Sequence, residues 1–250
     1  MTELAALALL GLALGVVSLT TAVRPGVVPL DRGGYFARWA VLHGGYDPSG
    51  SRFVRGWLGL VHALGRPLAR RGVLPNVVTV WSVWLALLVV VLARVGGRGW
   101  LLAGLVLAFS GLVDNLDGCV AVLQDRTSAW GYLLDSVLDR VSDALFLVAL
   151  VAAGCPGWLA VSTGFGCFLL EYVRARAGNA GGDPVVRITV AERSTRVLVL
   201  APTLLLCGAL PVHAGAVAAA GVAVLAVLTV VGLAQLAPAV RRQLAGLPTP

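Results

Sequence analysis

The chain has 250 residues, of which 58% are hydrophobic and only 12% charged, with a mean hydropathy of +0.90. Soluble domains carry about 25% charged residues, so this composition excludes an ordinary soluble domain and predicts a helical membrane protein. The net charge is +7, and all 19 basic residues are arginines, most of which lie between apolar runs. This placement indicates contact with lipid head groups of a bilayer and no nucleic-acid partner.

The N-terminal part of the chain predicts two helices outside the core. The apolar run at residues 4–23 predicts a signal-anchor helix, with Glu3 outside and Arg24 inside. In the segment that follows, at residues 24–74, apolar side chains recur at helical spacing while arginines lie off that face, which predicts an amphipathic helix. This helix lies in the membrane interface or packs against the bundle, and the two arrangements are compatible. The apolar stripe consists of Phe53, Trp57, Leu60, Val61 and Leu64.

Six further apolar runs are long enough for transmembrane helices, which need ~20 residues each. They cover about residues 77–95, 99–121, 131–154, 156–178, 194–212 and 214–238. Arginines concentrate before the first run, between the fourth and fifth, and after the sixth, so these ends are expected in the cytoplasm, with Arg94 and Arg98 as exceptions.

We therefore expect an all-α, polytopic membrane helix bundle with six core transmembrane helices. An N-terminal anchor helix and an interfacial segment occupy residues 1–65, and the membrane domain occupies residues 66–250. The expected location is the plasma membrane, crossed several times, with the active site facing the cytoplasm.

Half of the acidic residues lie in one short stretch of the chain. Six of the twelve fall between residues 114 and 143, namely Asp114, Asp117, Asp125, Asp135, Asp139 and Asp143. Carboxylates at membrane depth cost ~2.5–3.5 kcal/mol each, which makes them functional candidates. Spacings of three and four residues place them on one face of each of two neighbouring predicted helices.

Clustered carboxylates repel one another unless a cation lies between them, and oxygen-only ligands favour Mg²⁺ or Mn²⁺. A pair of such ions suits a phosphoryl displacement. A solvated acidic loop is the alternative, but apolar residues flank and interleave the aspartates.

The spacing of these residues resembles a known signature. Asp114-x-x-Asp117-Gly118-x-x-Ala121, followed by Gly131-x-x-x-Asp135-x-x-x-Asp139, is similar to the motif of the CDP-alcohol phosphatidyltransferase family. Upstream, Pro75-Asn76-Val77-Val78-Thr79 resembles the family's Pro-Asn-x-x-Thr at the start of its first core span. The resemblance covers about residues 66–240. It implies an enzyme that moves a phosphatidyl-type group from CDP-diacylglycerol to an alcohol and releases CMP.

The resemblance also implies roles for individual residues. Asp114, Asp117 and Asp135 would hold one or two Mg²⁺ or Mn²⁺ ions, two being expected, and Asp139 would be the general base and a possible further metal ligand. The nucleotide site would be lined by Asn76, Thr79, Gly118, Ala121, Ser128 and Gly131. Relatives in this family commonly dimerise through their spans, so a homodimer is expected.

One position departs from the family pattern. Val122 stands where the pattern has an arginine that helps to hold the donor. Arg126 lies one turn further on and would replace that arginine if the local helix continues. A relative that binds CDP-lipid without efficient turnover is therefore one alternative.

A narrower resemblance concerns the acceptor. Glu171-Tyr172-Val173-Arg174-Ala175-Arg176-Ala177 and Ala191-Glu192-Arg193-Ser194-Thr195-Arg196 are similar to segments of bacterial phosphatidylinositol phosphate synthases and, more loosely, of phosphatidylglycerol phosphate synthases. These enzymes use phosphorylated acceptors, inositol phosphate or glycerol 3-phosphate, and a guanidinium group donates paired hydrogen bonds to phosphate. The resemblance therefore implies Arg176 and Arg196, then Arg193 and Arg174, as ligands of the acceptor phosphate.

Three other interpretations stay open at this point. In one, the arginines are topology signals that contact lipid head groups; in another, the acceptor is an unphosphorylated alcohol such as serine. A cation-coupled transporter would also bury carboxylates, but it predicts an inverted repeat, and none is visible.

Overall fold

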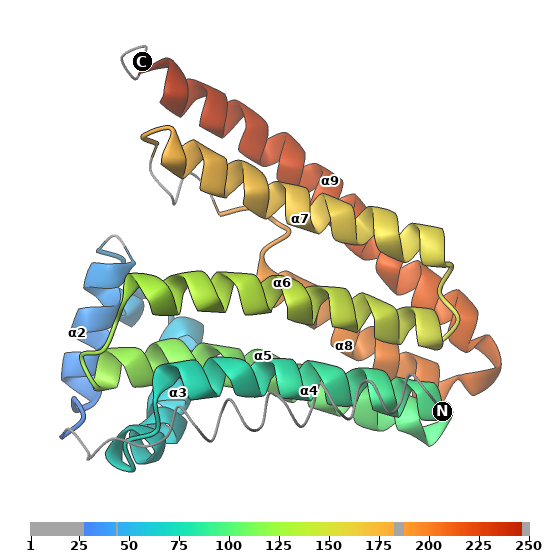
Figure 1. Ribbon diagram of the computed structural model, residues 1–250, viewed down its shortest axis with the longest axis horizontal. Helices are drawn as coiled ribbons and strands as arrows, with labels where there is room; N and C mark the ends of the chain where they lie inside the picture. Colours follow the sequence, from blue (N-terminus) through green and yellow to red (C-terminus); the bar gives the residue numbers. More distant parts are fainter. Residues whose placement is uncertain (1–27, 44, 183–187, 247–250) are drawn as a thin grey trace. The chain divides into compact units, whose positions relative to one another are not determined.

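The computed structural model describes residues 28–43, 45–182 and 188–246, and helices are the only regular secondary structure within them (Figure 1). The elements in chain order are α2 (Arg32–Leu42), η1 (Pro48–Gly50), α3 (Arg52–Arg70), α4 (Pro75–Val95), α5 (Arg98–Leu123), α6 (Ala129–Ala152), α7 (Gly157–Asn179), α8 (Arg193–Ala209), η2 (Pro211–His213) and α9 (Ala214–Ala245). The all-α prediction is thereby confirmed for the described part of the chain. The predicted anchor helix at residues 4–23 lies outside it.

Helices α4 to α9 coincide with the six predicted core spans. Three stretches are long and apolar enough to cross a membrane: α4, α5 and the segment Pro211–Ala245 that contains α9. Helix α6 carries several charged side chains in its first half, and α8 has only 17 residues, short of the ~20 that a perpendicular span requires. A membrane protein is therefore supported, while the full set of six spans stays a prediction.

The chain folds into two compact units. The first unit comprises the described residues up to Leu87 together with Phe109–Ser142, and the second comprises Leu88–Ala108 and the described residues from Asp143 onward. The predicted boundary at residue 65 stays a prediction; α3 is continuous across it.

In the first unit, short polar side chains begin the peripheral helices and an apolar core holds them. Asp31 accepts a hydrogen bond from the Gly34 amide at 2.8 Å and begins α2, and Ser51 caps α3 in the same way. The core of this unit contains the buried residues Tyr35, Leu58, Val61, Ala69, Val78, Val113, Leu116, Cys119, Val122 and Leu123. Helices α2 and α3 are thus packed into the unit by apolar burial.

The predicted amphipathic helix is present as α3, and its apolar stripe divides into two parts. Val61 is buried in the core of the first unit, whereas Phe53 is 80% exposed and Leu60 and Leu64 are also exposed. One part of the stripe therefore packs against protein. The exposed part is available for a membrane interface, as predicted for such a helix.

Close backbone approach joins α3 to α5. A Cβ atom at Gly65 would lie 2.8 Å from Cys119 Sγ, which is closer than packed atoms come. Just beyond α5, Gln124 donates hydrogen bonds from Nε2 to the carbonyls of Ala69 and Val73 at the end of α3. The absence of a side chain at residue 65 thus fixes how closely these helices pack.

Helices of the second unit also approach closely at glycine residues. Helix α9 packs along both α7 and α8, and Figure 1 shows α7 and α9 side by side. A Cβ atom at Gly221 would lie 2.2 Å from Thr203 Oγ1, and one at Gly166 would lie 3.0 Å from Thr229 Cγ2. Small residues at helix contacts are typical of membrane bundles, where dispersion contacts replace much of the hydrophobic effect.

We predict that Gly65→Val destabilises the protein by about 1–3 kcal/mol, because the added methyl groups overlap Cys119 Sγ. Gly56→Val is the matched control, since it makes the same change in the same helix where nothing lies within 4 Å of the new Cβ. Thermal unfolding in detergent measures both. Equal midpoints for the two variants would show that α3 does not depend on this contact.

Candidate active site

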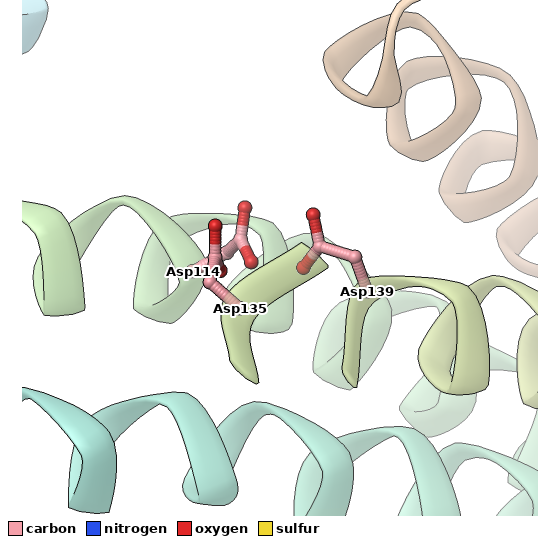
Figure 2. Close-up of side chains that lie close together, drawn as sticks. All are labelled: Asp114, Asp135 and Asp139. Atoms are coloured by element: carbon pink, nitrogen blue, oxygen red, sulfur yellow. The ribbon is translucent and has the colours of Figure 1, made fainter. Parts of the chain in front are cut away.

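Three carboxylates from two helices meet in the first unit. Asp114 comes from α5, and Asp135 and Asp139 come from successive turns of α6. One carboxylate oxygen of each lies within 4.8 Å of the other two, and Figure 2 shows the Asp139 carboxylate turned toward those of Asp114 and Asp135. The spacing in the sequence predicted this convergence, and the structure brings these three residues together.

The donor set of this aspartate trio fits a hard divalent cation. All three side chains are half-buried, so water screens their mutual repulsion less than it does at an open surface. They offer only oxygen atoms, which are the ligands that Mg²⁺ and Mn²⁺ prefer. Arg140 Nη2 lies 3.8 Å from Asp139 Oδ2 and adds a positive charge beside the trio.

Asp117 belongs to the same region but is held differently. It is buried, its Oδ2 accepts a hydrogen bond from Thr79 Oγ1 at 2.7 Å, and its Oδ1 accepts one from the Gly118 amide. The charges of Asp135 and Asp114 act on it as well. The sequence predicted Thr79 as a nucleotide contact; the structure shows that it also orients a predicted metal ligand from another helix.

A cavity of about 540 Å³ opens next to these carboxylates, a size typical of small-molecule sites. Its walls include all six residues predicted to line the nucleotide site, namely Asn76, Thr79, Gly118, Ala121, Ser128 and Gly131. Asp114, Asp117 and Asp135 also face it, whereas Asp139 is not among the lining residues. The structure thus gathers the predicted nucleotide residues around one cavity.

The two glycines of this wall have different surroundings. A Cβ atom at Gly118 would meet nothing within 4 Å, so this backbone is open to a ligand. A Cβ atom at Gly131 would lie 3.2 Å from Ser128 Oγ and 3.4 Å from Asn76 Oδ1. Ser128 Oγ accepts a hydrogen bond from the Gly131 amide at 3.0 Å and thereby caps the start of α6. These polar groups therefore leave room at residue 131 for little more than the hydrogen atom of glycine.

The position that departs from the family pattern packs into protein. Val122 is buried in the core of the first unit and also lines the cavity. Helix α5 ends at Leu123, so Arg126 is not on a continued helix as the substitution hypothesis required. It nevertheless lines the same cavity from the loop before α6.

Sequence reasoning missed one wall of the cavity. Helix α2 contributes Tyr35, Trp39, Leu42 and His43 to it. The only local signal was the presence of aromatic side chains four residues apart, which lie on one face of a helix but do not reveal what that face contacts.

The predicted acceptor arginines all lie in the second unit, at the end of α7 and the start of α8. Arg196 is 1% exposed, and it donates to Asp143 Oδ2 at 2.6 Å and to Glu171 Oε1 at 2.7 Å. Arg174 donates to Glu192 and lies 3.4 Å from Glu171 Oε2. These two guanidinium groups therefore already bind carboxylates of the chain.

Glu192 precedes α8 and is stabilised in its charged form. Burial alone would raise its pKa, but hydrogen bonds from Arg174 and from Thr189, together with the Arg174 charge, outweigh burial and lower the pKa. Glu192 thus stays ionised beside Arg174.

Arg176 and Arg193 have other surroundings. Arg176 is exposed in the last turn of α7, and Arg193 is the half-buried first residue of α8.

The sequence as a whole matches a known family. The sequence model of the CDP-alcohol phosphatidyltransferases matches residues 72–234, more than half of the chain. The chain belongs to this family. As a CDP-alcohol phosphatidyltransferase it carries the signature aspartates on α5 and α6 within the matched residues, and α2 and α3 lie before them.

Two curated relatives of this phosphatidyltransferase are both named as inositol phosphate lipid synthases. Archaetidylinositol phosphate synthase of Pyrococcus horikoshii is 33% identical over 140 residues, covering 55% of the chain and 72% of the relative. Phosphatidylinositol phosphate synthase of Cutibacterium acnes is 36% identical over 159 residues, covering 59% and 73% respectively.

Solved structures share the fold. A phosphatidylinositol phosphate synthase of Mycobacterium tuberculosis in complex with manganese and citrate has a TM-score of 0.65 at 22% identity, covering 76% of this chain and 93% of that one. A second structure of that enzyme, with CDP-diacylglycerol bound, has a TM-score of 0.58 at 24% identity and covers 72% and 93%.

We predict that Asp135→Asn weakens Mn²⁺ binding to the purified phosphatidyltransferase at least tenfold, because it removes one of the three charged ligands of the aspartate trio. Asp47→Asn is the control, since Asp47 is an exposed carboxylate that caps η1 outside the cavity. Electron paramagnetic resonance of free Mn²⁺ measures the affinity without any turnover. Equal affinities in the two variants would remove the trio as the metal site.

Proposed function

We propose that this phosphatidyltransferase moves a phosphatidyl group from CDP-diacylglycerol to a phosphorylated polyol, with inositol phosphate as the first candidate. The observation that carries the proposal is the aspartate trio beside a cavity that collects every predicted nucleotide residue. The names of the two curated relatives, both inositol phosphate lipid synthases, support the choice of acceptor.

Asp114, Asp117 and Asp135, with Asp139, are proposed to hold two Mg²⁺ or Mn²⁺ ions, and the manganese in the M. tuberculosis enzyme supports a divalent metal as the cofactor. Such ions supply charge neutralisation for the donor pyrophosphate. Thr79 keeps the Asp117 carboxylate directed through its hydrogen bond. Side chains of α4, α5 and α6 thereby position the pyrophosphate of the donor.

Asp139 is proposed as the general base. It accepts the proton of the acceptor hydroxyl while that oxygen bonds to the lipid-bearing phosphorus, and the bond from this phosphorus to the CMP oxygen breaks. No protein nucleophile is required, because positioning and charge stabilisation account for the acceleration. Arg140, 3.8 Å away, helps to keep the Asp139 carboxylate in place.

The acceptor phosphate is proposed to bind the arginines at the end of α7 and the start of α8, which are Arg174, Arg176, Arg193 and Arg196. The ion pairs of Arg174 and Arg196 compete with a phosphate, whereas Arg176 is exposed and has no such competitor among the contacts above. Arg176 is therefore the first residue to test.

The remaining parts of the proposal follow from charge distribution and family. We infer six core spans, a place in the plasma membrane, a site facing the cytoplasm and a homodimer. The concentration of arginines before α4, around the α7–α8 connection and after α9 supports this orientation.

A second acceptor class is favoured by one observation. Because Arg174 and Arg196 already bind Glu192, Asp143 and Glu171, part of the predicted phosphate pocket is neutralised. An unphosphorylated alcohol would need no free guanidinium group and is the alternative acceptor.

The test is CMP release by the purified protein in detergent, with CDP-diacylglycerol and Mn²⁺ or Mg²⁺. Inositol phosphate, glycerol 3-phosphate, inositol, glycerol and serine are supplied in parallel. We expect release that requires both a divalent metal and inositol phosphate. Release with serine or free inositol alone would contradict the phosphorylated acceptor.

The variant Asp139→Asn tests the general base in the same assay. It removes the base but keeps the shape of the side chain, so turnover falls by at least two orders of magnitude while CDP-lipid binding persists. Activity close to that of the unchanged protein would exclude Asp139 as the base.

We predict that Arg176→Ala raises the acceptor KM about tenfold or more and leaves the KM for CDP-diacylglycerol unchanged, since a hydrogen bond to a charged group contributes about 1.5–3 kcal/mol. Arg241→Ala removes an exposed arginine near the end of α9 and is the control. Steady-state kinetics with each substrate varied in turn measures both constants. A rise of twofold or less would exclude Arg176 from the phosphate pocket.

A further inference from the structure

Helix α2 lies outside the part of the chain that matches the family, yet it forms part of the cavity wall. The family match begins at residue 72, whereas α2 ends at Leu42. Tyr35, Trp39, Leu42 and His43 nevertheless line the cavity together with the signature residues. This wall therefore lies outside the residues that the family model matches.

Specific contacts hold α2 in this position within the first unit. Tyr35 is 2% exposed in the core, and its ring lies 5.5 Å from that of His62 on α3. On the other side, Arg38 Nη2 lies 3.1 Å from Asp125 Oδ1. Asp125 has φ +52° in the loop that leads to Arg126 and Ser128 of the cavity. Helix α2 is thus tied both to the core and to the loop opposite.

The side chains that α2 presents include a flat aromatic surface. The rings of Trp39 and His43 stack with centroids 3.9 Å apart and an angle of 16° between their planes. His43 Nδ1 lies 2.8 Å from the Trp39 carbonyl oxygen, which fixes the imidazole in this stack. Trp39 is half-buried and His43 exposed, so the pair keeps accessible area next to the cavity.

The chemistry around this aromatic pair suits a nucleobase better than an acyl chain. An acyl chain requires a continuous apolar wall, whereas the cavity also presents the polar side chains of Asn76, Arg126, Thr127 and Ser128. These groups offer donors and acceptors for the edge of a base and for a ribose. Stacking on aromatic side chains is a general way in which proteins bind bases, because every base has a flat π-face.

We propose that the cytosine base of the CDP-linked donor stacks on the outer face of the Trp39–His43 pair, so that α2 sets the affinity of the enzyme for the nucleotide. This proposal rests on the proposed function, because it assumes a CDP-linked substrate in the cavity. The pyrophosphate then lies toward Asp114, Asp117 and Asp135, which line the same cavity.

The test compares binding of CMP, which has the base but no lipid, with the KM for CDP-diacylglycerol. In Trp39→Ala we expect the Kd for CMP in the presence of Mn²⁺ to rise about tenfold, equal to ~1.4 kcal/mol, and the KM for CDP-diacylglycerol to rise with it. The KM for the acceptor stays unchanged. Trp39→Phe, which keeps a flat ring, retains most of the affinity. Trp81→Ala is the matched control, since Trp81 is an exposed tryptophan of α4 that does not line the cavity.

His43→Ala provides a second variant that does not depend on the packing of Trp39 against the core, because His43 is exposed. We expect a several-fold loss of CMP affinity with an unchanged midpoint of thermal unfolding. If Trp39→Ala and His43→Ala raise only the KM for CDP-diacylglycerol and bind CMP normally, α2 contacts the lipid and the proposal is overturned. If neither constant changes, α2 contacts no donor. If the unchanged protein neither binds CMP nor consumes CDP-diacylglycerol, the proposed function itself fails.

Discussion

A carboxylate surrounded by apolar helices must have a donor, a cation or a guanidinium group nearby, and this constraint organises the molecule. In the first unit, Asp117 is satisfied by the Thr79 hydroxyl and the Gly118 amide. In the second unit, Asp143 and Glu171 share the guanidinium group of the buried Arg196. The trio of Asp114, Asp135 and Asp139 is gathered so closely that a divalent cation is its natural complement. The cost of buried charge thus determines which kind of partner each carboxylate requires.

These polar groups come together because the helices pack closely at glycine residues. Gly65 lets α3 approach Cys119 on α5, and Gly131 fits between Ser128 and Asn76 at the edge of the cavity. In the second unit, Gly221 and Gly166 play the corresponding part against threonines. Because hydrophobic driving force between helices is weak in a bilayer, such close contacts determine which polar groups face one another. The geometry of the cavity therefore depends in part on residues that have no side chain.

The family match covers the signature aspartates but not every wall of the cavity. The fold is shared with a solved relative at a TM-score of 0.65 although only 22% of aligned residues are identical, so the arrangement of helices tolerates wide sequence change. The family match begins after α3, and the wall formed by α2 lies outside it. The proposed chemistry at phosphorus thus rests on residues of the family signature, and the proposed role of α2 rests on residues outside the family match.

The sequence by itself determined the helices and the family. Apolar length and periodicity placed α4 to α9 to within a few residues, except that α9 continues to Ala245, because helix formation depends on neighbours three and four residues away. The same spacing placed Asp135 and Asp139 on one face. Only the tertiary structure decided which groups meet across helices, such as Thr79 with Asp117, 38 residues apart, and Arg196 with Asp143, 53 residues apart. Those pairings, and the α2 wall, depend on how side chains from distant segments pack, and the local pattern of the sequence does not contain that information.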